Sequence, residues 1–171
     1  LLFNGRMRRV HSVQNAASTT VYGLNVGIDV KLPLGFVLHS VYNIQNGVEE
    51  MDDGQRSRPR HAAPAFGTTR LRFRSQKTEL QLYMVYQNEL SFLELNPEEK
   101  AKPVLYARDG DGNPYSPDWK TINLKILHQL DDRFSLSAGI ENITDERYRP
   151  YSSGLSAPGR NVVISLKGLI Y

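Results

Sequence analysis

The sequence alternates between apolar and polar residues over several segments of about eight or more positions. From Tyr22 to Leu32 every even position is apolar, whereas the odd positions carry glycine, Asn25, Asp29 and Lys31. A period of two places successive side chains on opposite faces of a β-strand. The pattern therefore predicts a strand with one apolar face.

The same alternation recurs along the chain and predicts about seven antiparallel strands, with residues 1–13 as an eighth. The in-phase, mostly apolar set is Tyr22, Leu24, Val26, Ile28, Val30, Leu32, Phe36, Leu38, Ser40, Tyr42, Leu71, Phe73, Leu80, Leu82, Met84, Tyr86, Ile122, Leu124, Ile126, His128, Leu130, Phe134, Leu136, Ala138, Ile140, Val162, Ile164, Leu166, Gly168 and Ile170. The opposite set includes Arg70, Arg72, Arg74, Glu79, Gln81, Asn123, Lys125 and Glu141.

The connections between these segments are sorted by length. Tight turns are predicted at 33–35, 75–78 and 131–133, and long polar loops at 45–65, 87–118 and 144–160. In a meander the short turns then meet at one end of the sheet and the long loops at the other. Outer-membrane barrels have this asymmetry, with short periplasmic turns and long extracellular loops.

The residues of the apolar set also favour a lipid-facing surface. None of them is Asp, Glu, Lys or Arg, and an Arg or Lys at the bilayer midplane costs about 2–4 kcal/mol. The aromatic members fall near the two predicted ends, as in the girdles of membrane barrels. These are Tyr22, Tyr42 and Tyr86 near the long loops, and Phe36, Phe73 and Phe134 near the short turns.

Composition narrows the class without deciding it. The 171 residues contain no cysteine, carry a formal net charge of +3, and have a pI near 9.2 and a mean hydropathy of -0.44. The mild, scattered charge does not argue for a nucleic-acid partner. No apolar run approaches the roughly 18 residues of a membrane helix, but membrane strands need only about 9–11 residues. A soluble ligand-binding β-barrel with its apolar face turned inward, and a complete eight-stranded outer-membrane barrel with a structural or adhesive role, remain alternatives.

The last third, "GIENITDERYRPYSSGLSAPGRNVVISLKGLIY", resembles the C-terminal end of TonB-dependent outer-membrane receptors. The residues that carry the resemblance are Glu141, Asn142, Thr144, Asp145, Tyr148, Pro158, Gly159 and Arg160. Upstream, "TTVYGLNVGIDV", "RPRHAAPAFGTTRLRF" and "DWKTINLKI" are similar to the segments that lead into barrel strands in this family.

The resemblance implies an all-β fold in which these seven or eight antiparallel strands are part of a 22-stranded transmembrane barrel. It implies residence in the outer membrane of a Gram-negative bacterium and uptake of an iron chelate, such as a ferric siderophore, or of a similarly scarce nutrient. The implied partners are outer-membrane lipid, the remaining barrel strands, a plug domain, and TonB acting through that plug. Residues 1–171 are then expected to be a C-terminal segment of the barrel, without the plug.

The position of Tyr171 does not fully fit the pattern of the family's last strand. Members of the family commonly end on an aromatic residue in phase with the lipid-facing positions. The even-numbered apolar set of residues 162–170 is out of phase with Tyr171. A bulge or a change of face near Lys167 and Gly168 would bring Tyr171 into phase, and without one a lipid-facing role of Tyr171 as an assembly signal is weakened.

Two loops contain the candidate ligand-binding residues. Arg56, Arg58, Arg60 and His61 lie in one, where guanidinium groups could bind an anionic chelate or a lipopolysaccharide phosphate. A solvated basic loop without a ligand is an equally good interpretation of this segment. Arg147 and Tyr151, together with Tyr148, Arg149 and Arg160, are candidates in the other. For the second loop a structural role is favoured, in which Asn142, Thr144 and Asp145 satisfy backbone groups and Pro158 and Gly159 shape the return of the chain.

No other pattern predicts chemistry. Asp109, Asp111 and Asn113 have the spacing of a calcium loop, but Pro114 and Lys120 occupy positions where an EF-hand needs Gly and Glu, so a turn is predicted. The four histidines lack metal-ligand spacing. No catalytic triad, phosphate loop or carboxylate pair is recognisable. The sequence therefore predicts no enzyme, cofactor or metal site.

Overall fold

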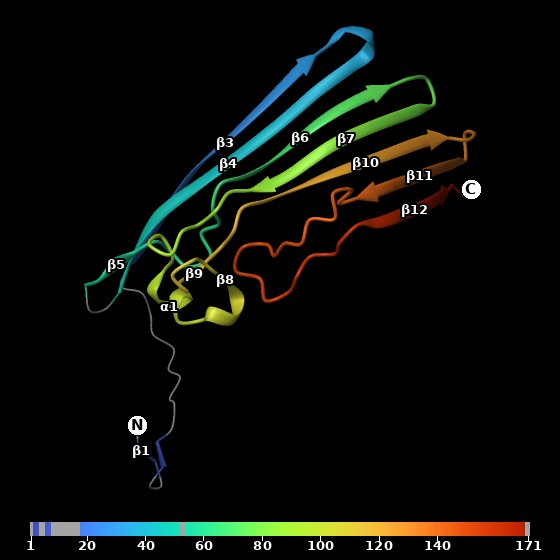
Figure 1. Cartoon of the computed structure of the whole chain (residues 1–171). Coiled ribbons are helices and arrows are strands. Elements are labelled where there is room, and N and C mark those ends of the chain that lie inside the picture. Colours follow the sequence, from blue (N-terminus) through green and yellow to red (C-terminus); the bar gives the residue numbers. More distant parts are fainter. Residues whose placement is uncertain (1, 4–5, 8–17, 52–53, 170–171) are drawn as a thin grey trace.

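The computed structural model describes residues 2–3, 6–7, 18–51 and 54–169 of the chain. Seven long strands form one antiparallel sheet in the order β12-β11-β10-β7-β6-β4-β3, in which each strand pairs with its neighbour along the chain (Figure 1). They are β3 (Ser18–Lys31), β4 (Phe36–Glu50), β6 (Phe66–Arg74), β7 (Thr78–Gln87), β10 (Trp119–Gln129), β11 (Phe134–Glu141) and β12 (Asn161–Gly168). The predicted all-β meander is confirmed.

The short elements lie outside this row of strands. They are β1 (Leu2–Phe3), β2 (Arg6–Met7), the 3-10 helix η1 (Pro33–Gly35), β5 (Arg56–Ser57), α1 (Pro97–Lys100), the 3-10 helix η2 (Pro103–Leu105), β8 (Ala107–Arg108) and β9 (Pro114–Tyr115). Among the described residues, no helix is long and apolar enough to cross a membrane.

The eighth strand of the sheet is not the one predicted. It is β5, whose two residues pair with Glu49 and Glu50 at the end of β4. Within 1–13, β1 and β2 pair with each other, and the remaining residues of that segment lie outside the described part of the chain. Its sequence alternates too weakly to specify a partner strand.

The short turns and the long loops are at opposite ends of the sheet, as predicted. Figure 1 shows three tight connections at one end, while α1, β8 and β9 gather at the other. One boundary differs, because 45–50, predicted as loop, continues β4. Residues 18–23 of β3 lie opposite and pair with this polar segment. Backbone hydrogen bonds to that neighbour hold this segment in the strand, although its sequence lacks the apolar alternation that would have predicted it.

The alternating apolar set of the seven strands lies on one face, because the register aligns these positions across every pair. Leu38 pairs with Leu71, which pairs with Leu82, and Leu82 pairs with Leu124. The row continues through Ile140 to Val162. A slip of one residue in any pair would have moved a strand's apolar side chains to the other face. The interpretation of a single apolar face is therefore confirmed.

This apolar face is uncovered. Tyr22, Leu24, Ile28, Val162 and Ile164 are each more than half exposed. Among the described residues, the buried apolar side chains lie in the long loops instead, at Ala62, Leu90, Leu95 and Tyr106. Water-soluble monomers rarely expose an apolar area as large as seven strands, so this face requires an apolar surrounding.

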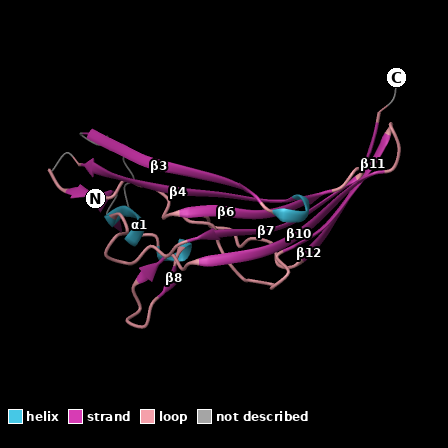
Figure 2. Cartoon of the chain, turned by 90° about the horizontal axis from the view of Figure 1, so that it is seen from above, coloured by secondary structure: helices cyan, strands magenta, loops and turns pink. Residues whose placement is uncertain are grey.

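The opposite face is polar and hollowed. A groove of about 350 Å³ runs along it between side chains of β7, β10, β11 and β12, among them Gln81, Tyr83, Lys125, Ser137 and Glu141. Figure 2 shows that the sheet is curved rather than flat. In the described residues β3 and β12 are its two edges and do not pair with each other. Both small-barrel alternatives require a closed sheet, and these strands form an open one.

Aromatic side chains lie at both ends of the apolar face. Phe36 and Phe73 are paired in register near the short turns, with ring centroids 5.0 Å apart. Near the long loops, the rings of Tyr42 and Tyr86 stack with centroids 6.3 Å apart. Gly67 is paired with both tyrosines across the sheet. The predicted arrangement of two aromatic bands is present in these pairs.

We expect Gly67→Ala to destabilise the sheet by about 1–3 kcal/mol, the usual cost of overpacking. A Cβ at residue 67 would lie 2.5 Å from both the Tyr86 hydroxyl and the Val41 carbonyl oxygen. Gly27→Ala in β3 is the control, because a Cβ there would meet no atom within 4 Å. Denaturant unfolding of the intact protein in detergent measures the difference. Equal midpoints for the two variants would contradict the prediction.

The described end of β12 keeps the same face toward the apolar side. Its register with β11 continues without a break to the pairs Ser135 with Lys167 and Phe134 with Gly168. The Phe134 ring covers Gly168, whose added Cβ would lie 2.9 Å from it. The described residues therefore contain no bulge near Lys167 and Gly168 that would bring Tyr171 into phase. Tyr171 lies outside them, and its role stays a prediction.

Candidate functional site

The three long loops pack into one cluster at the end of the sheet. Its apolar centre is formed by Leu90, Leu95 and Tyr106, with Leu105 and Tyr151 packed against them. Leu90 and Ser116 exchange backbone hydrogen bonds of 2.9 and 3.0 Å, which tie the two ends of the 88–118 loop together. The loops are therefore an ordered unit with a core of their own.

The arginine side chains of the first long loop bind oxygen atoms of the protein itself. Arg58 donates to the carbonyl oxygens of Gln45, Ala62 and Ala63 at 3.0–3.2 Å. Arg60 donates to both oxygens of the buried Glu49, through its backbone and side chain. Arg56 is more exposed and forms an ion pair of 2.9 Å with Glu50.

This arrangement makes Arg58 and Arg60 part of the loop framework in this conformation. The ligand contacts predicted for Arg56, Arg58, Arg60 and His61 stay a prediction. His61 hydrogen-bonds the Ser152 hydroxyl across 2.9 Å and so joins the first long loop to the third.

Helix α1 connects all three loops. Asn96 precedes it, caps its N-terminus, and donates to Glu49 and to the Arg58 carbonyl. Glu98 accepts a 2.7 Å hydrogen bond from Arg60. Glu99 is 1% exposed and accepts hydrogen bonds from the Tyr151 and Ser152 hydroxyls. A buried carboxylate needs such donors, since burial without them would neutralise it.

The surroundings of Glu99 change the titration of two tyrosines. Burial, together with the negative charge of Glu99, raises the pKa of Tyr106 to about 12. Burial, followed by the hydrogen bond to Glu99 and the charge of Glu99, raises the pKa of Tyr151 above its usual range. Both phenols are thus held neutral by the folded loops.

We expect the loop cluster to lose stability as the pH rises from about 10 to about 12. A phenol whose pKa is raised on folding contributes its full stabilisation below the unfolded pKa of about 10, and loses it as the pH passes the folded value. Tyrosinate absorbance of the intact protein measures this, and Tyr106→Phe should remove a component that titrates near pH 12. The same titration in denaturant is the control. A difference curve centred near pH 10 would contradict the assignment.

The "ENITDERY" segment forms a tight, hydrogen-bonded turn after β11. Asn142 is 3% exposed and has a left-handed φ of 51°. Its backbone N–H donates to Asn123, and its side chain bonds the Glu146 backbone and the Pro158 carbonyl. Asn tolerates this backbone conformation better than most residues.

The return of the loop contacts the same turn. The Arg160 backbone N–H donates to Asp145 Oδ1 at 2.8 Å, and its Nε donates to the Ile143 carbonyl at 2.9 Å. A Cβ on Gly159 would lie 2.7 Å from Asp145 Oδ1. Thr144 is exposed, and Glu141 pairs with Asn161 at the end of β11. These contacts are of the kind expected from a structural role, which stays a prediction.

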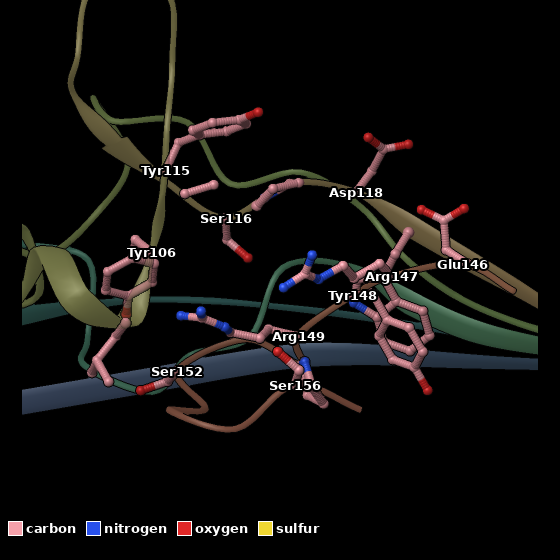
Figure 3. Close-up of a pocket in the computed structure, with 15 residues that line it drawn as sticks. Tyr106, Tyr115, Ser116, Asp118, Glu146, Arg147, Tyr148, Arg149, Ser152 and Ser156 are labelled. Carbon is pink, nitrogen blue, oxygen red and sulfur yellow. The ribbon is translucent and has the colours of Figure 1, made fainter. Parts of the chain in front are cut away.

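A pocket of about 270 Å³ opens between the second and third long loops. Figure 3 shows side chains from both loops around it, including Tyr106, Tyr115, Asp118, Arg147 and Arg149. One wall is the stack of Trp119 on Tyr148, with ring centroids 4.1 Å apart. Arg147 and Tyr148, both predicted candidates, therefore line the pocket, whereas Tyr151 packs in the neighbouring core.

The Asp-Gly segment is a turn, as predicted. Asp109 accepts hydrogen bonds from the backbone N–H groups of Asp111 and Asn113 at 3.0 and 2.8 Å. These bonds lower the pKa of Asp109, with the bond from Asn113 as the largest cause. The turn closes the hairpin of β8 and β9.

Several members of the cluster escaped sequence reasoning. Glu49, Asn96, Glu99 and Trp119 come from segments without alternation, so no pattern indicated which of them would be buried. Trp119, the chain's single tryptophan, follows an exposed Asp118 where a strand begins. The position of this single tryptophan, at the junction of a loop and a strand, was the only sequence feature that could have indicated a site here.

Comparison with known proteins confirms the fold. No family model and no curated protein matches the sequence. The copper transporter OprC is similar over 88% of this chain, with a TM-score of 0.68 and 15% identity. A mutant of the ferric enterobactin receptor PfeA of Pseudomonas aeruginosa matches over 86%, with a TM-score of 0.59 and 15% identity.

A third solved structure, the siderophore receptor PiuA of Acinetobacter baumannii, matches over 88% of the chain with a TM-score of 0.56 and 14% identity. The chain spans only 22–23% of the length of these three proteins. At such identities the likeness concerns the fold alone. The resemblance to TonB-dependent receptors thus holds at the level of the fold, and the chain has the architecture of a section of such a barrel.

Proposed function

We propose that the chain is the C-terminal part of the barrel of an outer-membrane receptor that takes up a small molecule with energy from TonB. The observation that carries the proposal is the single apolar face, continuous across seven strands and uncovered by any other described element. In an outer membrane this face would contact lipid, and the polar, grooved face would line the lumen.

The open sheet supports the proposed division of the receptor. Unpaired strand edges are not tolerated in hydrocarbon, so β3 and β12 would pair with further strands of the same barrel. A plug domain, coupled to TonB, would occupy the lumen beside the polar face. Strands β3 and β4 extend beyond the 9–11 residues that cross the bilayer, so their ends would project among the long loops outside the cell.

The proposed ligand is an iron chelate of the siderophore type. PfeA and PiuA are described as receptors for ferric enterobactin and for a siderophore, and OprC as a copper transporter. Two of these three relatives in fold thus have siderophore-type ligands, and the cationic and aromatic side chains of the loop cluster suit an anionic chelate.

Membrane fractionation and uptake together test the proposal. The intact protein encoded by the source gene should sediment with the outer membrane, and its deletion should slow growth under iron limitation unless TonB is already absent. Recovery in the soluble fraction would overturn the membrane assignment. Normal uptake of every ferric chelate tested would overturn the transport assignment.

The isolated chain provides a separate test of the proposed division. Expressed alone, it should fail to fold both in buffer and in detergent, as judged by circular dichroism and heat-modifiable gel migration. Folding in plain buffer would favour the soluble barrel. A compact, heat-modifiable band in detergent would favour a self-sufficient small barrel.

A further inference from the structure

The pocket beside Trp119 contains polar groups that the protein itself does not use. Arg147, Asp118 and the Glu146 carboxylate line it, and within the described part of the chain their side chains have no hydrogen-bond or ion-pair partner. The pocket therefore presents charged groups of both signs that no other described residue neutralises.

The two signs of charge occupy different sides of the pocket. In the view of Figure 3, the Arg147 and Arg149 guanidiniums lie together on one side, and the Asp118 and Glu146 carboxylates on the other. No ion pair within 4 Å links the two sides among the described residues. Arg149 is partly engaged, because it donates to the Val104 carbonyl at 2.9 Å. Arg147 is therefore the free cation of the pocket.

The wall between the two sides is aromatic. Trp119 stacks on Tyr148, and Tyr106 and Tyr115 lie on the side of the second loop. Rigid aromatic walls beside a few charged groups fix the orientation of a ligand that has an apolar part and a charged part.

We infer that this pocket binds a zwitterionic group of the amino-acid type. Its carboxylate would pair with Arg147, and its ammonium group would face Asp118 and Glu146. The group could be a free amino acid or the end of a larger ligand. This inference rests on the proposed receptor function, and it narrows the chemistry of what such a receptor would recognise at this mouth of the lumen.

Isothermal titration of the intact protein in detergent tests the inference with three probes that share a phenylethyl skeleton. Phenylalanine carries both charges, phenylpropionate only the acid, and phenethylamine only the amine. Phenylalanine should bind most tightly. Arg147→Gln should weaken its binding by about tenfold or more, the loss expected for a charge-assisted hydrogen bond.

Two further variants sharpen the result. The double variant Asp118→Asn with Glu146→Gln should bind phenylalanine more weakly than the unchanged protein does. Its affinity for phenylpropionate should be unchanged or higher, because only an ammonium group faces those carboxylates. Arg133→Gln is the matched control, since this exposed arginine lies in the short turn at the other end of the sheet, where its backbone N–H donates to Asp131. It should bind phenylalanine like the unchanged protein.

Phenylpropionate binding as tightly as phenylalanine would overturn the inference, as would an Arg147→Gln variant with unchanged affinity or the absence of binding up to millimolar probe. If the protein lies in the outer membrane and these results are negative, only the present inference fails. If it is recovered in the soluble fraction, the proposed function fails first.

Discussion

Replacing Ile126 by Arg should destabilise the protein in its membrane by about 2 kcal/mol or more, because a cation would enter the hydrocarbon. Ile126 lies on the apolar face, paired with Leu80 and Ala138. The cost of an Arg on the lipid face falls from about 2–4 kcal/mol at the midplane to about 0–1 near the interfaces. Denaturant unfolding of the intact protein in lipid vesicles measures the loss.

The next residue provides a matched control. Leu127 is 41% exposed and Ile126 is 40% exposed, so both variants remove similar apolar contact within the same strand. Leu127 faces the polar side, where it pairs with Glu79 and Ser137. Leu127→Arg should therefore be nearly neutral, with Glu79 nearby as a counter-charge. Equal losses for the two variants would refute a lipid-facing assignment of the apolar face.

Removing the cation of Arg60 should release the loop cluster from the sheet. Glu49 is 3% exposed, and Arg60→Met would leave it with Asn96 as its remaining side-chain partner. Breaking a buried ion pair on one side costs about 3–5 kcal/mol, since the other charge stays buried and uncompensated. We expect rapid proteolysis or hydrogen exchange of residues 54–65 and 88–105.

Arg56→Met is the control for this second prediction. Arg56 belongs to the same loop and forms an ion pair with Glu50, but its side chain is 71% exposed. Exposed pairs contribute about 0–1 kcal/mol. Its loops should therefore keep the protection of the unchanged protein. An Arg60→Met variant as well protected as Arg56→Met would show that the ion pair with Glu49 does not hold the cluster.

The strands were predictable because their signal is local and repeated. Alternation from Tyr22 to Leu32 and from Ile122 to Leu130 fixes both the strand and the side that each residue faces. The lengths of the connections then decide which ends meet. The failures fall where alternation stops, at the polar extension of β4 and in residues 1–13. A strand in such a segment depends on which backbone lies opposite, and one sequence does not state that.

The candidate site was only partly predictable. The sequence pointed to Arg147 and Tyr148, which line the pocket, and to Arg58 and Arg60, whose guanidiniums instead bond the protein's own oxygens. The sequence does not distinguish a loop arginine that contacts a ligand from one that hydrogen-bonds a backbone carbonyl group. Its partners here are up to 38 residues away along the chain, a distance over which no sequence period operates.

The sequence by itself determined the all-β meander, the single apolar face and the separation of short turns from long loops, because each follows from the pleat of a strand and the chemistry of neighbouring residues. Only the tertiary structure decided that β3 and β12 are the open edges of the sheet among the described residues, that Glu49, Asn96 and Glu99 bind three loops together, and that a pocket forms between Trp119 and Arg147. These features depend on contacts between segments that meet only after the strands have paired.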